Sequence, residues 1–110
     1  MEGTSTRIAP RTALDRTVEV KIGDQTLRVE NPSNNLSVGG LFLRRETLPA
    51  GTPVHIRISS RQVFEADGQV CNSGNGERGV GIRFSSLSDG NREALYDLIE
   101  DLTLRGLPAA

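Results

Sequence analysis

Apolar and polar side chains alternate in short runs through most of the chain, which is the pattern of strands with one buried face. The segment Val18-Glu-Val-Lys-Ile22 is the clearest example, and Gly23-Asp24 after it fits a tight hairpin turn. We predict six strands from this pattern, at about residues 18–22, 27–29, 41–43, 54–58, 63–70 and 80–84.

The period changes to that of a helix near the C-terminus. Ser88 fits an N-cap, and Gly106 and Pro108 fit a stop signal, so we expect one helix within residues 88–105 and a short tail at 106–110. Four apolar residues at helical spacing would form its buried face: Leu95, Leu98, Ile99 and Leu102.

This order of elements favours a single, mainly β domain. A chain of 110 residues is long enough for one domain and too short for two. Twelve glycines and five prolines suit many turns between short strands. We therefore predict a six-stranded antiparallel β-barrel, closed or nearly closed, with one C-terminal α-helix over an end or a side.

The first 16 residues are polar and have neither strand nor helical periodicity, and they carry Arg7, Arg11 and Arg16. We predict a flexible N-terminal arm over residues 1–16 and a barrel with its helix over 17–105. Residues 1 to about 10 should be mobile without a ligand.

Composition excludes several classes of function. The formal net charge is -1, so no broad positive field would attract a nucleic acid polymer, and an anionic ligand would need a local arginine cluster. No apolar run approaches the roughly 18–20 residues of a membrane span and no signal-peptide core follows Met1, so we expect a cytoplasmic protein without membrane insertion.

Few residues could support catalysis or metal binding. Cys71 and His55 are the only residues of their types, which argues against a disulfide framework and a Cys/His metal site. We expect His55 to face solvent from a strand. No nucleophile-base pair is recognisable, so we expect neither an enzyme nor a bound cofactor. The aromatic residues are expected in the core, by their periodicity: Phe42, Phe64, Phe84 and Tyr96.

One segment combines polar side chains with glycines. Asn35 and Ser37 are two positions apart, so in an extended chain both would point to the same face. Gly39 and Gly40 follow, and a ligand could approach the main chain closely there. The alternative interpretation is a turn in which Asn35 and Ser37 bond only to their own backbone.

The arm adds Arg7-Ile-Ala-Pro-Arg11, with Arg16 as a third cation. A guanidinium group donates hydrogen bonds in pairs, which suits phosphates and the O6/N7 edge of guanine. The alternative is a solvated tail without a ligand, because arginines near a terminus are usually solvated.

Together the two segments resemble the motif pair of PilZ domains, Arg-x-x-x-Arg followed by Asn/Asp-x-Ser-x-x-Gly at the start of a strand. The resemblance covers about residues 7–104 and includes Asp67-Gly-Gln-Val70 and the segment Gly79-Val-Gly-Ile-Arg-Phe84. It implies a six-stranded barrel that binds cyclic di-GMP on its outer surface, with the arginine arm over the ligand.

The resemblance also implies roles for single residues. Arg7 and Arg11 would contact phosphates and guanine edges, and Asn35 and Ser37 would hydrogen-bond guanine or phosphate. Gly40, the last residue of the motif, would leave room for the ligand.

Two functions remain open at this point. The first is a cyclic di-GMP receptor whose ordered arm alters a surface read by an effector protein of motility, pilus, secretion or polysaccharide control. The second is a PilZ-like interaction module of motility machinery that binds no nucleotide. The arginine pair is also open, since Arg11 and Arg16 could form it instead of Arg7 and Arg11.

Overall fold

The structure is a computed structural model that describes residues 11–72 and 79–105. Within these residues the elements, in chain order, are β1 (Thr12–Ala13), β2 (Val18–Ile22), β3 (Gln25–Val29), β4 (Asn35–Ser37), β5 (Gly40–Arg44), β6 (Pro53–Ile58), β7 (Phe64–Asn72), β8 (Gly79–Ser86) and α1 (Asp89–Arg105).

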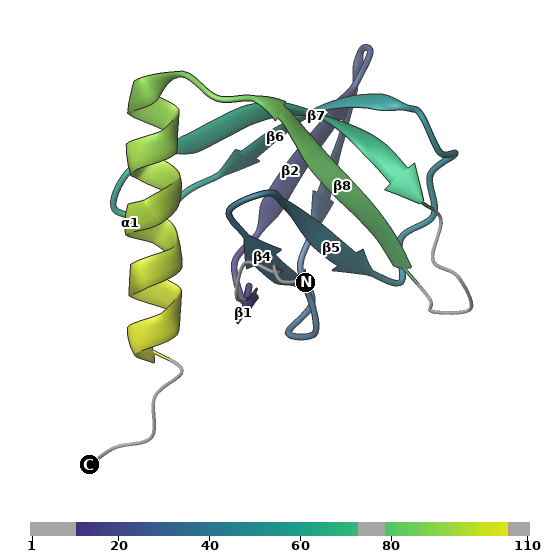
Figure 1. The fold of residues 1–110 in the computed structure, drawn as a ribbon. Coiled ribbons are helices and arrows are strands. Elements are labelled where there is room, and N and C mark those ends of the chain that lie inside the picture. The colour runs from purple at the N-terminus through teal and green to yellow at the C-terminus, as the bar shows by residue number, and fades with distance from the viewer. Residues whose placement is uncertain (1–10, 73–78, 106–110) are drawn as a thin grey trace, which may run out of the picture.

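The strands form one antiparallel sheet in the order β1-β4-β5-β8-β7-β6-β2-β3, which curls into a half-barrel (Figure 1). The mainly β fold with one C-terminal helix is confirmed, with eight strands in the described part of the chain where six were predicted. The two additional strands are β1 and β4, of two and three residues. Runs this short contain too few positions for an alternating pattern to be recognised.

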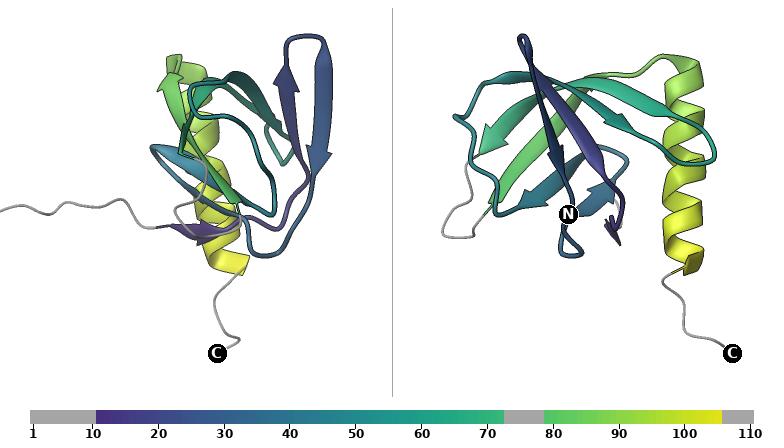
Figure 2. Two further views of the ribbon diagram at one scale, coloured as in Figure 1. Left: turned by 90° about the vertical axis from the view of Figure 1, so that its right-hand side faces the viewer. Right: turned by 180° about the vertical axis from the view of Figure 1, so that it is seen from behind.

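The β2–β3 hairpin forms one end of the sheet order and extends from the body of the fold (Figure 2). Ile22 pairs with Gln25, so the loop has two residues, as Gly23-Asp24 predicted. Gly23 has a φ of 59°, the left-handed conformation that such a turn requires at its first position.

The core lies on the concave side of the sheet, where alternate residues of the long strands point inward. Phe64 and Phe84 meet edge to face there, with ring centroids 5.3 Å apart. The prediction that all four aromatic residues would be buried was wrong for Phe42, which is half-buried, and for Tyr96, which is 52% exposed. Phe42 follows Leu41, which faces the core, so its own side chain projects from the outer face of β5.

Helix α1 begins where the sequence predicted. Ser88 Oγ accepts a hydrogen bond of 3.1 Å from the backbone N–H of Asn91, which is an N-cap. The helix packs against β7 and β1 through a face that includes Leu95, Leu98 and Leu102. No helix among the described residues is long and apolar enough to span a membrane.

Part of the predicted arm lies against the sheet. Residues 1–10 are outside the described residues, but β1 pairs with β4, and Leu14 after it is fully buried. The backbone N–H of Leu14 donates a hydrogen bond of 2.8 Å to the carbonyl oxygen of Asn34. Asn34 is itself buried, and its side-chain Oδ1 accepts from the backbone N–H of Arg44. Asn34 therefore connects the arm to β5.

Candidate ligand-binding site

Arg11 lies beside the residues of the second motif. Its Nε donates a hydrogen bond of 2.5 Å to Oδ1 of Asn35, and its Nη1 donates one of 3.5 Å to Oγ of Ser37. The pairing of β1 with β4, in which Ala13 lies opposite Asn35, brings the arginine to this position. Two predicted site segments that are far apart in sequence are thus adjacent in the structure.

Asn35 and Ser37 point to the same face of β4, as the extended backbone predicted, because Leu36 between them is in the core. Ser37 also bonds within its own turn: its Oγ accepts from the N–H of Gly39 and donates to the carbonyl oxygen of Gly40, both at 3.4 Å. Ser37 thus bonds both to Arg11 and within its own turn, whereas the Asn35 side chain bonds to Arg11. The alternative in which both side chains bond only to their own backbone was therefore wrong.

The two glycines of the motif differ in their surroundings. A Cβ built on Gly40 would collide with the carbonyl oxygen of Ile82, so β8 packs too closely there for any side chain. A Cβ on Gly39 would meet nothing within 4 Å. The structure thus accounts for Gly40 through strand packing, whereas Gly39 faces open space.

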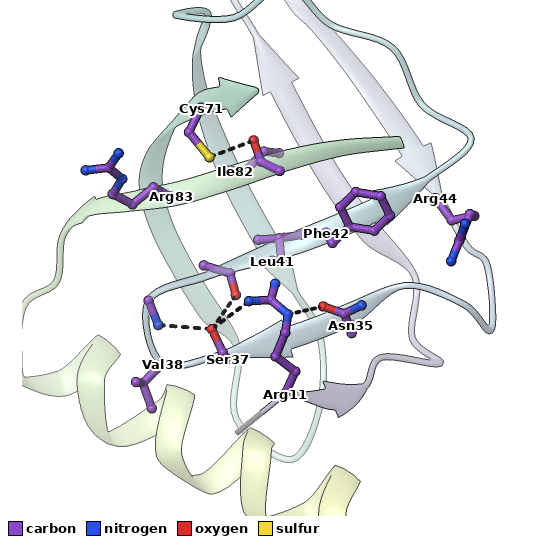
Figure 3. A pocket seen from close by; sticks show the side chains of 13 residues that line it. Arg11, Asn35, Ser37, Val38, Leu41, Phe42, Arg44, Cys71, Ile82 and Arg83 are labelled. Carbon is purple, nitrogen blue, oxygen red and sulfur yellow. Dashed lines mark hydrogen bonds between the residues drawn. The ribbon is translucent and has the colours of Figure 1, made fainter. Parts of the chain in front are cut away.

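These residues border a cavity of about 650 Å³ on the outer face of the sheet (Figure 3). Its volume is in the range of small-molecule sites. The lining comes from the arm and from β4, β5, β7 and β8, with the β4–β5 turn: Arg11, Asn35, Ser37, Val38, Gly39, Gly40, Leu41, Phe42, Arg44, Cys71, Gly81, Ile82 and Arg83.

The charged residues among the described lining of this cavity are all basic. Arg11, Arg44 and Arg83 contribute guanidinium groups, and none of the described lining residues is acidic. Arg11 and Arg83 are both exposed. The chain as a whole is close to neutral, so the cavity is the kind of local arginine cluster that an anionic ligand would need.

The sequence analysis did not identify Phe42, Arg44 or Arg83 as site residues. The alternation of side chains along β5 could have placed Phe42 and Arg44 on the outer face, because Leu41 and Leu43 face the core. Arg83 follows the same rule on β8, between the buried residues Ile82 and Phe84. Which outer-face residues meet at one cavity depends on the strand order, which the pattern does not specify.

Two predicted residues are not placed at the cavity. Arg7 lies outside the described residues. Arg16 is not part of the lining: its Nη2 is 2.6 Å from Oδ2 of Asp101 on α1, and its Nη1 donates to Oγ of Ser60. Within the described residues, Arg16 therefore fastens the arm to the helix.

His55 faces outward from β6, as predicted, but it is not simply solvated. Its Nδ1 is 2.9 Å from Asp67 and its Nε2 is 2.8 Å from Glu65. The hydrogen bond with Asp67, and then the one with Glu65, raises the pKa of His55 above its ordinary value. In the described part of the chain, no cluster of three or more His, Cys, Asp or Glu side chains could hold a metal ion.

Comparison with solved structures shows the same fold in other proteins. The chain is similar to the PilZ domain with c-di-GMP of YcgR from Escherichia coli, with 22% identity and a TM-score of 0.71 over 92% of this chain and 94% of that chain. It is also similar to YcgR in complex with c-di-GMP from the same organism, with 21% identity and a TM-score of 0.66 over 90% of this chain and 46% of that one.

The inhibitor of motility MotI/DgrA of Bacillus subtilis is a further match, with 16% identity and a TM-score of 0.68 over 96% of this chain and 55% of that chain. The chain thus spans about half the length of MotI and of the longer YcgR structure. No curated protein matches the sequence. The profile of the PilZ domain matches residues 5–101. The chain therefore belongs to the PilZ domain family.

Proposed function

We propose that this PilZ domain is a cytoplasmic cyclic di-GMP receptor and adaptor, and that the nucleotide binds in the arginine-lined cavity. One observation carries the proposal. Every predicted ligand-binding residue that the structure describes, apart from Arg16, lines the same cavity, although Arg11 and Asn35 are 24 positions apart. The described residue set is Arg11, Asn35, Ser37, Gly39 and Gly40.

The chemistry of the cavity suits a cyclic dinucleotide. Its phosphates are anionic, and Arg11, Arg44 and Arg83 supply three permanent positive charges. Arg11 uses two of its five N–H donors on Asn35 and Ser37, which leaves the others for a phosphate or a guanine edge. Asn35 and Ser37 hold this guanidinium in position, so part of their effect on the ligand is exerted through Arg11.

The proposed adaptor role rests on the connection between the cavity and the helix. Thr12 follows Arg11, and its Oγ1 accepts a hydrogen bond from Thr103 on α1 at 3.4 Å. Arg16 binds Asp101 on the same helix. A ligand that moves Arg11 would therefore act on the segment that contacts α1, and an effector protein could read that surface. The similarity to an inhibitor of motility supports motility as an output.

A second function is favoured by the same contacts. Since Arg11 bonds to Asn35 and Ser37, these three residues can hold the arm on the sheet. The domain would then be a PilZ-like docking module of motility machinery that binds no nucleotide.

Calorimetric titration with cyclic di-GMP separates the two. We expect a dissociation constant of about one micromolar or lower, corresponding to about -8 kcal/mol. Arg28→Ala, a change to an exposed arginine on β3 that does not line the cavity, is the matched control and should bind like the wild type. No detectable heat at ligand concentrations near a millimolar would refute the receptor and leave the docking module.

A further inference from the structure

Phe42 is the one aromatic residue of the chain that lines the cavity. The chain has four aromatic residues, and the structure describes all of them. Phe64 and Phe84 are in the core, and Tyr96 is on α1 and does not border the cavity. The ring of Phe42 is half-buried and stands on the outer face of β5.

The ring lies against the main chain of β8. A Cβ built on Gly79 would collide with the tip of the Phe42 ring, so the ring occupies the space that a side chain at position 79 would need. In Figure 3 the ring is seen face-on in the cavity. The guanidinium carbon of Arg44 is 5.6 Å from its centroid, within the range of a cation–π contact. Gly79 on β8 and Arg44 on β5 thus fix the orientation of the Phe42 ring.

The position of the ring relative to Arg11 is set by strand pairing. Asn35 on β4 lies directly opposite Phe42 on β5. Side chains in such a pair share one face, with Cβ atoms about 4.5–5.5 Å apart. Because Asn35 holds the guanidinium of Arg11, an aromatic face and a guanidinium group are close neighbours on the cavity wall.

We propose that Phe42 is a base-stacking residue: one purine ring of the ligand lies on the face of Phe42 while its polar edge is bound by Arg11. This proposal rests on the proposed function, and it adds a specificity determinant that lies outside the arginine and Asn-x-Ser motifs. A nucleobase offers both parts of this recognition, a flat π-face for the ring and a hydrogen-bonding edge for the guanidinium. Inorganic phosphate or a sugar phosphate without a base would use only the arginines.

The test combines calorimetry with proton NMR of the bound nucleotide, for the wild type and Phe42→Leu. We expect Phe42→Leu to weaken cyclic di-GMP binding about five- to a hundredfold, as measured for other base–aromatic stacks. The guanine H8 signal should move upfield on binding to the wild type but not on binding to Phe42→Leu, because only the wild type places the base over an aromatic ring. Tyr96→Leu removes an exposed ring outside the cavity and should change neither readout.

The outcomes separate the two proposals. If the wild type binds cyclic di-GMP and Phe42→Leu binds equally well, stacking is refuted while the receptor function stands. If Phe42→Leu binds more weakly but the H8 shift of the wild type is absent or unchanged by the substitution, the ring has only a structural role, and stacking is again refuted. If the wild type does not bind, both proposals fail together.

Discussion

The guanidinium Nε of Arg11 and the amide Oδ1 of Asn35 are joined by a hydrogen bond of 2.5 Å across 24 positions of sequence. The bond exists because β1 runs antiparallel to β4 with Ala13 opposite Asn35. Both residues were predicted to touch the ligand directly. Their contact gives the amide a second role, because it can also orient the guanidinium. A double-mutant cycle can separate the two roles.

We predict that the effects of Arg11→Ala and Asn35→Ala on cyclic di-GMP affinity are not additive. Arg11→Ala removes a charge-assisted contact and should cost about 1.5–3 kcal/mol, or about ten- to a hundredfold in affinity. If Asn35 acts mainly through Arg11, Asn35→Ala should weaken binding in the wild type but change it little in the Arg11→Ala background. Calorimetry on the four proteins measures the coupling. Fully additive losses would show that Asn35 contacts the nucleotide independently.

Ser37→Ala should weaken binding less than Arg11→Ala does. The hydroxyl group makes three long hydrogen bonds, one of 3.5 Å with Arg11 and two of 3.4 Å with the main chain of Gly39 and Gly40. The expected loss of affinity is about 0.5–1.5 kcal/mol, the range for one neutral hydrogen bond. A larger loss than for Arg11→Ala would mean that Ser37, rather than the arginine, is the principal contact.

Arg16→Ala should lower stability and leave affinity unchanged. The ion pair of Arg16 with Asp101 is mostly shielded, with side-chain exposures of 18% and 20%, and it joins the arm to α1. We expect the free energy of unfolding to fall by about 1–2 kcal/mol in urea denaturation. Cyclic di-GMP titration of the same variant tests the register of the motif. A loss of affinity comparable to that of Arg11→Ala would identify Arg11 and Arg16 as the functional pair.

Alanine substitutions at the two motif glycines should differ in their effect on the free energy of unfolding. Gly40→Ala would bring a methyl group into the carbonyl oxygen of Ile82, so we expect a loss of about 1–3 kcal/mol in the free energy of unfolding. Gly39→Ala has open space and should change stability by less than about 1 kcal/mol. Equal stabilities in thermal or urea unfolding would contradict the close packing of β5 on β8.

His55 should make stability depend on pH. Its pKa is raised by hydrogen bonds, first to Asp67 and then to Glu65, above the ordinary value of 6.5. The folded state therefore binds the proton more tightly than the unfolded state. The resulting stabilisation is fully present below pH 6.5 and is lost as the pH rises through the folded-state pKa. NMR titration of the ring should give the raised pKa, and His55→Gln should remove this part of the pH dependence of unfolding.

The long strands and the helix were predictable because each carries a local pattern. Val18 to Ile22 alternates strictly, and Ser88 caps the helix as its position indicated. The short strands β1 and β4 were not predictable, because they have no local periodicity. They are strands because β1 pairs with β4 and β4 pairs with β5. Phe42 was assigned to the core by periodicity, but Leu41 and Leu43 on either side of it are the residues that face the core, so Phe42 lies on the outer face.

The meeting of Arg11 with Asn35 and Ser37 followed from family resemblance and not from spacing. A separation of 24 positions is compatible with many arrangements, and only the order of strands selects one. The additional cavity residues Arg44 and Arg83 lie on β5 and β8, which are neighbours in the sheet. A pattern within one strand specifies the face of a residue but not the strand beside it.

The docking of residues 11–14 on the sheet has a thermodynamic consequence for recognition. Fixing the backbone of one residue costs about 1–2 kcal/mol of conformational entropy at room temperature. For the segment that ends at Leu14 that cost is part of folding, since the burial of Leu14 and the pairing of β1 with β4 are contacts within the protein. The backbone next to Arg11 is thus held by folding while the arginine side chain stays exposed, so nucleotide binding should carry only a small entropic penalty from the backbone of this segment.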